Sequence, residues 1–241
     1  MPTEPTAEPV LRGARARARA EVTDAIKQTA RRHLATDGAA ALSLRAVARE
    51  LGMVSSAVYR YVASRDELLT LLIIDAYDAV GLAAETAASH SRRAAPARRF
   101  VTVATAIRRW AVDHPHEFAL IYGSPVPGYA APLDTIASAS RVTAALVGVV
   151  ADAHRDGKLR IGHDLAPAIP RKLADDLVRV RDFIGTDVPD GLVVRVLAAW
   201  TQLFGLISFE LFGQTRNVIE AHADLFEATS TVMAELIGLD D

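Results

Sequence analysis

The chain has 241 residues, of which 51% are hydrophobic and none is cysteine, and its formal net charge is −2. This length suffices for one large or two modest domains, and the missing cysteines exclude disulfide and thiolate chemistry in this sequence. Residues 1–13 lack the apolar core of a signal peptide, and Asp75 and Asp78 interrupt the apolar stretch 68–82. We therefore expect a cytoplasmic protein without a membrane segment.

Positive charge gathers at the beginning of the sequence. Residues 1–65 carry 11 Lys and Arg against 6 Asp and Glu, whereas the remainder carries 16 against 23, so the two parts have charges of +5 and −7. This asymmetry predicts that one end meets a polyanion, although chance is the alternative. Residues 1–18, where Pro and Glu precede alternating Arg and Ala, are predicted to form a disordered basic arm. Such an arm either contacts phosphate or is a solvated tail.

Helical periodicity begins after this arm. Apolar side chains recur every fourth residue at Val22, Ile26, Ala30 and Leu34, which predicts a helix that ends at Gly38. A second helix is predicted over 44–51, with Ser43 as its N-cap and Gly52 as its stop. A short third helix is predicted over 55–62. Ser64 and Glu67 form a capping box that opens a long helix over 64–88.

Two short helices joined by a tight turn can place the second helix in the major groove of DNA. On this interpretation small or polar side chains meet the bases, while the tyrosines and arginines contact phosphate or guanine. The alternative is a helical hairpin with a solvated face and partly buried tyrosines. The candidate DNA-binding residues are Arg45, Ser55, Ser56, Ala57, Tyr59, Arg60, Tyr61 and Arg65.

The remainder of the chain is also predicted to be helical. A basic, Ala-rich segment at 88–99 is the expected link to a second domain, and a turn-rich loop is expected over 123–132. No strand is predicted, so the expected fold is all-α with nine or ten helices. The further helices are expected near 96–113, 116–122, 134–155, 164–184, 189–212 and 217–238.

The segment from about Val22 to Leu72 resembles the DNA-binding domain of the tetracycline-repressor (TetR) family of transcriptional regulators. The resemblance rests on Ser43-x-x-x-Val47-Ala48-x-x-Leu51-Gly52-Met53, Ala57-Val58-Tyr59-x-Tyr61-Val62 and Arg65-x-x-Leu68-Leu69. It implies a helix-turn-helix domain over 19–65, an α-helical effector-binding and dimerisation domain over 66–241 that includes the connecting helix 64–88, and a homodimer. It also implies that all the candidate DNA-binding residues except Arg60 align with positions that commonly contact DNA.

This sequence departs from the family pattern at three positions. Val54 occupies a place where Ser or Thr usually caps the recognition helix, so we expect Ser55 to cap the helix one residue later. Tyr61 stands where His is frequent, and Arg65 where Lys is frequent. Both substitutions are compatible with phosphate binding.

The second domain resembles a TetR C-terminal subgroup named for a Trp-His-Gly pattern. The matching residues are His114-Pro115-x-x-Phe118, the loop 123–129, and Trp200-x-x-x-Phe204-Gly205, in which Phe204 replaces the His. Apolar aromatic residues in this domain either line an effector pocket or belong to the ordinary core. They are Trp110, Phe118, Tyr122, Phe183, Trp200 and Phe204.

The last two helices are apolar over much of their circumference, which is typical of a helix buried on two sides. In the family these helices form a four-helix bundle with a second subunit, and an internal core is the alternative. The expected interface residues are Leu192, Val196, Leu203, Ile207, Leu211, Leu225 and Val232.

The sequence does not indicate an enzyme. His114-x-His116-Glu117 lacks the spacing of a helical zinc motif, and Gly123-x-x-x-x-Gly128 lacks the Lys of a phosphate-binding loop. We expect no cofactor and no metal. The sequence thus predicts a homodimeric regulator, a repressor that a small apolar effector releases from a pseudo-palindromic operator in double-stranded DNA. The alternative is a helical module that binds a small molecule or a protein without sequence-specific DNA binding.

Overall fold

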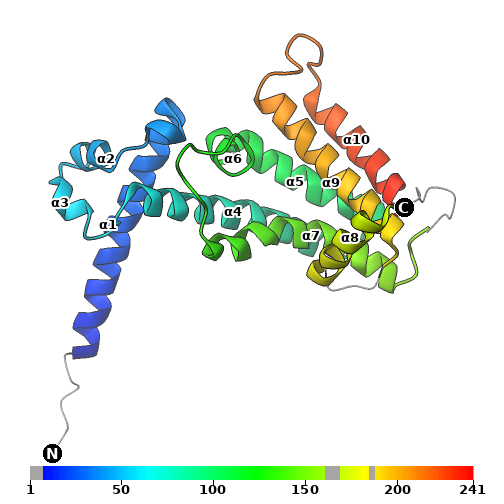
Figure 1. Cartoon of the computed structure of the whole chain (residues 1–241), viewed down its shortest axis with the longest axis horizontal. Helices are drawn as coiled ribbons and strands as arrows, with labels where there is room; N and C mark the ends of the chain where they lie inside the picture. Colours follow the sequence, from blue (N-terminus) through cyan, green and yellow to red (C-terminus); the bar gives the residue numbers. More distant parts are fainter. Residues whose placement is uncertain (1–7, 161–168, 185–187, 241) are drawn as a thin grey trace, which may run out of the picture. The chain divides into compact units, whose positions relative to one another are not determined.

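A computed structural model describes residues 8–160, 169–184 and 188–240. Its described residues form ten α-helices and two 3-10 turns, with one isolated β-bridge between Leu159 and Leu239 and no named strand (Figure 1). The predicted all-α fold is therefore confirmed. The helix α8, Arg171–Ile184, starts later than predicted, and residues 164–168 of the expected helix lie outside the described residues.

The chain divides into two compact units. The first contains residues 1–76 and 116–135, and the second contains residues 77–115 and 136–241. The boundary predicted at residue 65 therefore moves into the long helix, and the segment 116–135 joins the first unit. The helices of the first unit are α1 (Glu8–Asp37), η1 (Ala39–Ala41), α2 (Leu44–Glu50), α3 (Ser55–Val58), the start of α4 (Arg65–His90), α6 (Pro115–Tyr122) and η2 (Leu133–Thr135).

The first unit has one apolar core. Ile26 from α1, Val47 from α2, and Val58 and Val62 of the recognition segment (residues 55–62, which contain α3 and the turn after it) are at most 1% exposed, and Leu68 of α4 joins them. Ile26 lies on the face of α1 that its fourfold apolar periodicity predicts to be buried. The segment 116–135 adds partly buried side chains to the same core, namely Leu120, Val126 and Tyr129.

Two elements of the first unit differ from their predicted bounds. The prediction of disorder is wrong for residues 8–18, because α1 begins at Glu8; Ala and Arg are strong helix formers and sustain the helix before it reaches the core. The α-helix α3 ends at Val58, although Val62 N–H still donates to the carbonyl of Val58 (3.1 Å) through a turn. Tyr59 and Tyr61 therefore follow the recognition helix instead of lying within it.

Of the two predicted N-caps in the first unit, one makes its capping hydrogen bonds and the other does not. Ser64 Oγ accepts a hydrogen bond from the N–H of Glu67 (3.0 Å), and a carboxylate oxygen of Glu67 accepts one from the N–H of Ala63 (2.5 Å). The predicted capping box at the start of α4 is thus present, with Ala63 as the second donor. Ser43 occupies the N-cap position of α2, but its side chain makes no capping hydrogen bond.

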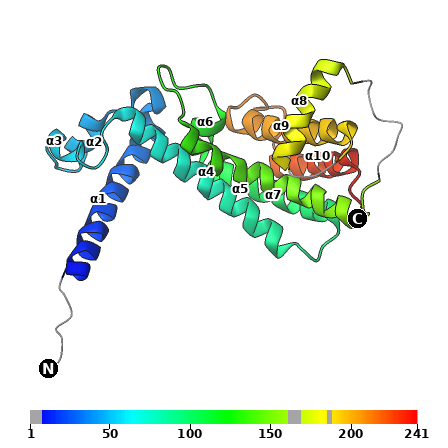
Figure 2. The same cartoon turned by 60° about the horizontal axis from the view of Figure 1, so that its bottom comes forward.

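The second unit is a helical bundle. Its helices after α4 are α5 (Pro96–Asp113), α7 (Ile136–Arg155), α8, α9 (Asp190–Leu211) and α10 (His222–Ile237). Helix α10 packs on α9 and α5, α7 packs on α5, and α8 packs on α9 (Figure 2). Within this core Arg108 of α5 donates two hydrogen bonds to the Glu210 carboxylate of α9, at 2.8 and 2.6 Å.

Helix α7 is fixed to α4 by one arginine. Arg141 donates to both carboxylate oxygens of Glu85 (2.8 and 2.7 Å) and to Asp78 Oδ1 (2.7 Å). These hydrogen bonds lower the pKa of Glu85 below its usual value. The helices approach closely at Gly81, where a Cβ atom would lie 2.8 Å from the Cβ of Arg141. Only glycine leaves space for the arginine at this crossing.

Two helical segments also satisfy the length and apolarity of a membrane span. They cover Leu133–Arg155 and Asp190–Leu211, and 33% and 39% of their apolar windows are buried in the protein. Both supply side chains to the core, including Leu146 and Leu203. Helices of a buried bundle commonly have this composition, so the two segments are weak evidence for a membrane.

Candidate DNA-binding surface and effector pocket

The recognition segment presents polar and basic side chains to solvent. Arg45 on α2 and Ser56, Tyr59 and Arg60 in and after α3 are exposed, and Tyr59 retains 44% of its accessible surface. Ser55, Ala57 and Tyr61 are partly buried. Val58 and Val62 point into the core and Tyr61 packs partly against it, so Tyr59 and Arg60 are the outward-facing residues between the two valines. The predicted DNA residues of 55–61 thus form one short stretch that is exposed at Ser56, Tyr59 and Arg60, and Arg45 is exposed on α2.

Helix α3 begins without a side-chain cap. Val54 holds the N-cap position with extended backbone angles, its side chain makes no capping hydrogen bond, and it is 70% exposed. The expectation that Ser55 caps the helix one residue later is wrong, because Ser55 is the first helical residue. The helix therefore starts where a capping Ser or Thr at position 54 would start it. Gly52, with φ of 65°, makes the preceding turn.

Arg65 has partners that the sequence did not reveal. Its Nε atom donates to the carbonyl oxygen of Leu42 (3.1 Å), and its Nη2 atom donates to those of Ala39 (2.9 Å) and Ala40 (3.2 Å). These carbonyls belong to η1 and the residue that follows it. Arg65 therefore joins the start of α4 to the α1–α2 connection. Its predicted phosphate contact has to compete with these three acceptors.

Ion pairs hold α1 against its neighbours in the first unit. Glu50 at the end of α2 accepts hydrogen bonds from Arg32 (2.7 Å) and lies 2.6 Å from His33 Nε2, and these contacts lower the pKa of its carboxyl group. Asp75 of α4 pairs with Arg31 (2.5 Å) and Lys27 (3.0 Å) of α1. The contacts fix α2 and α4 relative to the helix that carries the basic N-terminal segment.

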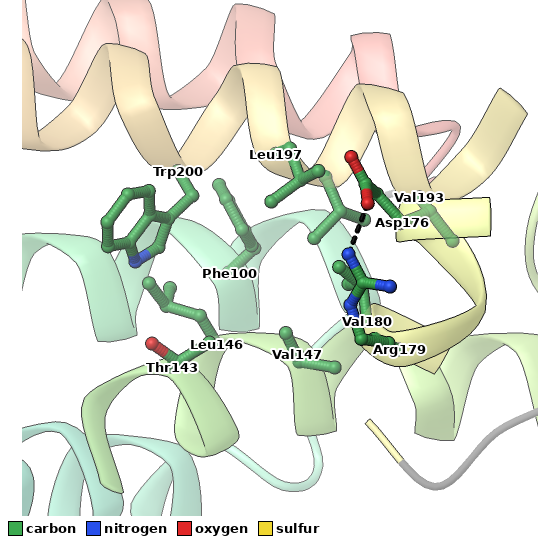
Figure 3. A pocket seen from close by; sticks show the side chains of 11 residues that line it. Phe100, Thr143, Leu146, Val147, Asp176, Arg179, Val180, Val193, Leu197 and Trp200 are labelled. Carbon is green, nitrogen blue, oxygen red and sulfur yellow. Dashed lines mark hydrogen bonds and ion pairs between the residues drawn. The ribbon is translucent and has the colours of Figure 1, made fainter. Parts of the chain in front are cut away.

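The second unit contains an apolar cavity of about 480 Å³ between α5, α7, α8 and α9 (Figure 3). Apolar side chains dominate its wall, and the ion-paired residues Asp176 and Arg179 of α8 stand on one side. The volume is in the range of sites for small organic ligands. The lining residues are Phe100, Thr143, Leu146, Val147, Asp176, Arg179, Val180, Val193, Val196, Leu197 and Trp200.

The six aromatic residues expected at an effector pocket are dispersed. Trp200 lines the cavity, and Phe204 packs against Trp200 with ring centroids 5.0 Å apart. Trp110 is buried and stacks on His114, whereas Phe118 and Tyr122 belong to the first unit. The side chain of Phe183 lies outside the described residues. The other lining residues were missed because Val and Leu on helix faces have the same pattern as an ordinary core.

The residues expected at a dimer interface also separate into groups. Leu192, Leu203 and Ile207 are at most 2% exposed within a single chain, so they form its interior and offer no surface to a partner. Val196 lines the cavity. Leu211 and Leu225 are partly buried, and Val232 is 55% exposed. The other large apolar side chains exposed in and between α9 and α10 are Leu197, Phe209, Phe212 and Val218.

Comparisons with known proteins identify the family. The family model of bacterial regulatory proteins of the tetR family matches residues 26–72, and the model of the tetracyclin repressor-like C-terminal domain matches residues 100–233. The chain belongs to the TetR family. An HTH-type transcriptional regulator of Mycobacterium tuberculosis is 43% identical to this TetR-family protein over 203 residues, which cover 84% of this chain and 86% of the relative.

Solved structures agree with this assignment. A regulatory protein with a crystal structure is 34% identical to this TetR-family chain, and the two structures superpose with a TM-score of 0.74. The match covers 91% of this chain and 98% of that protein's chain. The TetR-family regulator PfmR from Thermus thermophilus is 18% identical, covers 90% and 99% of the two chains and has a TM-score of 0.56, which shows a common fold. The predicted DNA-binding transcriptional regulator is thereby confirmed, whereas the Trp-His-Gly subgroup stays a prediction.

Proposed function

We propose that this regulator is a homodimeric repressor in the cytoplasm that leaves a pseudo-palindromic operator when an apolar small molecule enters the cavity of the second unit. The cavity carries the proposal, because about 480 Å³ of apolar space within a bundle is large enough for an organic ligand. Its wall is mostly apolar with two charged side chains at one side, which is the usual make-up of a site for a small organic ligand.

The DNA contacts follow from the exposed recognition segment. Ser55, Ser56 and Ala57 at the start of α3 are small enough to approach base edges in the major groove. Tyr59, Arg60 and Tyr61 suit phosphates or guanine, and Arg45 suits a guanine from the first turn of α2. We assign Arg65 to the support of η1, because its donors are engaged by backbone carbonyls.

The link between ligand and DNA is built into the chain connectivity. Helix α7 supplies Thr143, Leu146 and Val147 to the cavity, and its first residue directly follows η2. The loop before η2 is held in the first unit, where the Tyr129 hydroxyl lies 2.9 Å from Thr70 Oγ1 of α4. A ligand that moves α7 therefore pulls on a segment attached to the DNA-binding unit. The ligand must prefer one of the two arrangements for this pull to alter DNA affinity.

Two copies of the chain would bind the two halves of the operator. The exposed apolar side chains on α9 and α10, including Phe209 and Val232, offer surface for the partner. The two recognition helices should then lie ~34 Å apart, or a small multiple of that distance, because successive half-sites face the same side of DNA after one helical turn.

The DNA part of the proposal is tested with DNA from the region upstream of the protein's own gene. Arg45→Ala combined with Tyr59→Ala should abolish specific binding in a gel-shift titration while the circular dichroism spectrum is unchanged. Arg98→Ala with Val112→Ala is the control, because both residues are exposed on α5 of the second unit. Unaltered operator affinity in the Arg45 and Tyr59 variant would show that these residues do not form the interface.

The cavity is tested with the neutral fluorophore N-phenyl-1-naphthylamine. Its emission should rise on binding the wild-type protein, and Val147→Trp should abolish the rise by filling the cavity. Val112→Trp is the matched control, because Val112 is 40% exposed and does not line the cavity. Equal fluorescence from both variants would locate the probe elsewhere and contradict the assignment of the cavity.

A further inference from the structure

We propose that residues 13–20, here called the basic helix arm, bind the phosphate backbone of DNA beside the bases read by α3. The arm is the exposed early part of α1 and contains Arg15, Arg17 and Arg19. This inference rests on the proposed DNA contacts of the recognition segment. It adds a second contact surface, which recognises duplex DNA by charge and not by sequence.

The arm extends beyond the part of α1 that the core requires. Every residue from 13 to 20 is exposed, and the first buried residue in the part of the helix whose side chains are described, 13–37, is Ile26. In both views no other element of the first unit lies alongside the early part of α1 (Figures 1 and 2). Packing therefore does not account for the arm. Its helical form fixes the arginine positions in advance, which lowers the entropy lost on binding.

One face of the arm meets the recognition segment. Arg15 and Arg19 lie one turn apart on the same face, whereas Arg17 points to the opposite face because a helix turns about 100° per residue. The Cζ atom of Arg19 lies 5.3 Å from the centre of the Tyr61 ring. Tyr61 follows α3 and is itself a candidate phosphate ligand. The face with Arg15 and Arg19 thus continues the surface assigned to DNA.

Most arginines on this surface have no ion-pair partner among the described side chains. Of the nine arginines of the first unit whose side chains are described, Arg31, Arg32 and Arg65 have carboxylate partners. No ion pair is found, within the described residues, for the other six, and all six are exposed. They are Arg15, Arg17, Arg19, Arg45, Arg49 and Arg60.

The spacing of the arm suits a nucleic-acid backbone. Arg15 and Arg19 are separated by about 6 Å along the helix axis. Each DNA strand carries one phosphate charge per ~3.4 Å of its axis, so two long arginine side chains one helical turn apart can both reach phosphates of the same strand. A polyanion is the expected partner of unpaired arginines. Because Arg19 lies against Tyr61, that polyanion is the DNA whose phosphates Tyr61 is proposed to contact. The arm therefore fits the backbone next to the half-site.

The test measures affinity for a mixed-sequence DNA duplex by fluorescence anisotropy at several KCl concentrations. In the wild type, log affinity should fall steeply as log salt rises. Arg15→Ala with Arg19→Ala should make this dependence less steep, by about 1.8 in the magnitude of the slope, since each lost phosphate contact contributes ~0.9. Arg17→Ala with Arg98→Ala removes the same charge from positions off this face and should change the slope much less. Alanine preserves the helix, so circular dichroism should be unchanged.

The charge-conserving variant Arg15→Lys with Arg19→Lys should keep most of the wild-type slope. If Arg15→Ala with Arg19→Ala behaves like the wild type, or both double-alanine variants lose affinity equally, the arm is not a DNA contact. A wild-type protein whose affinity does not depend on salt would instead contradict the proposed DNA binding itself. The two failures are therefore distinguishable.

Discussion

Replacing Arg65 by alanine separates a structural role from a DNA contact. The wild-type guanidinium donates to the carbonyls of Ala39, Ala40 and Leu42 and is 31% exposed. A hydrogen bond that involves a charged group is worth roughly 1.5–3 kcal/mol, but water can partly replace Arg65 at these carbonyls. We therefore expect Arg65→Ala to lower the free energy of unfolding of the first unit by about 2 kcal/mol. DNA affinity should fall only as far as the connection between α1 and α2 loosens.

The loss corresponds to a urea midpoint about 1 M lower, for a typical slope of about 2 kcal/mol/M. Hydrogen exchange over residues 39–69 measures it in the right unit, because both tryptophans, Trp110 and Trp200, belong to the second unit. Arg60→Ala is the control, since Arg60 is exposed. If Arg65 binds phosphate instead, Arg65→Ala should leave the midpoint unchanged and lower the salt slope of DNA binding by about 0.9. That result would refute the assignment of Arg65 to support.

Three further predictions concern stability. Arg108→Met should destabilise the second unit by about 3 kcal/mol in denaturant titrations, because Glu210, 15% exposed, loses its partner. Adding Glu210→Leu should restore most of the lost stability, because no unpaired charge then remains. A double variant no more stable than Arg108→Met would contradict this. Because the pKa of Glu85 is lowered in the folded protein, the ionised carboxylate stabilises the fold above its unfolded pKa of ~4.3, and this stabilisation is lost as the pH falls through the folded pKa. The free energy of unfolding of Glu85→Gln should therefore depend less on pH in the acid range than that of the wild type. Parallel curves for the two proteins would disprove this. Val54→Ser should give α3 the side-chain cap that it lacks and so add ~1 kcal/mol to the stability of the first unit. The urea midpoint should therefore rise, and a lower midpoint would count against this.

The order of the helices could be read from the sequence because it depends on local patterns. The fourfold recurrence of Val22, Ile26, Ala30 and Leu34 marks the inward face of α1, and Ser64 with Glu67 sets the start of α4. Such signals act within one or two turns of helix, so they survive without knowledge of the tertiary fold. The resemblance to the TetR family rested on the same local segment and was confirmed.

Features that depend on distant segments were not predictable in this way. Arg65 matches a family position associated with DNA, yet its partners are carbonyls more than 20 residues earlier in the chain. The sequence predicts a disordered arm over residues 1–18, because the alternation of arginine with alanine hides the helical face that Arg15 shares with Arg19. No feature of Phe100 or Leu146 indicated that they would face a cavity, because a residue beside a void and a residue in a packed core have the same composition.

Local patterns are enough to predict the helical class and the recognition segment, because periodicity and capping act through neighbouring residues. Which apolar faces meet, and where a cavity remains between them, depends on the tertiary structure. It assigned residues 116–135 to the DNA-binding unit, buried Leu192, Leu203 and Ile207 inside one chain, and left a cavity beside Trp200. These outcomes depend on how whole helices pack, and packing is a property of pairs of surfaces that no single stretch of sequence contains.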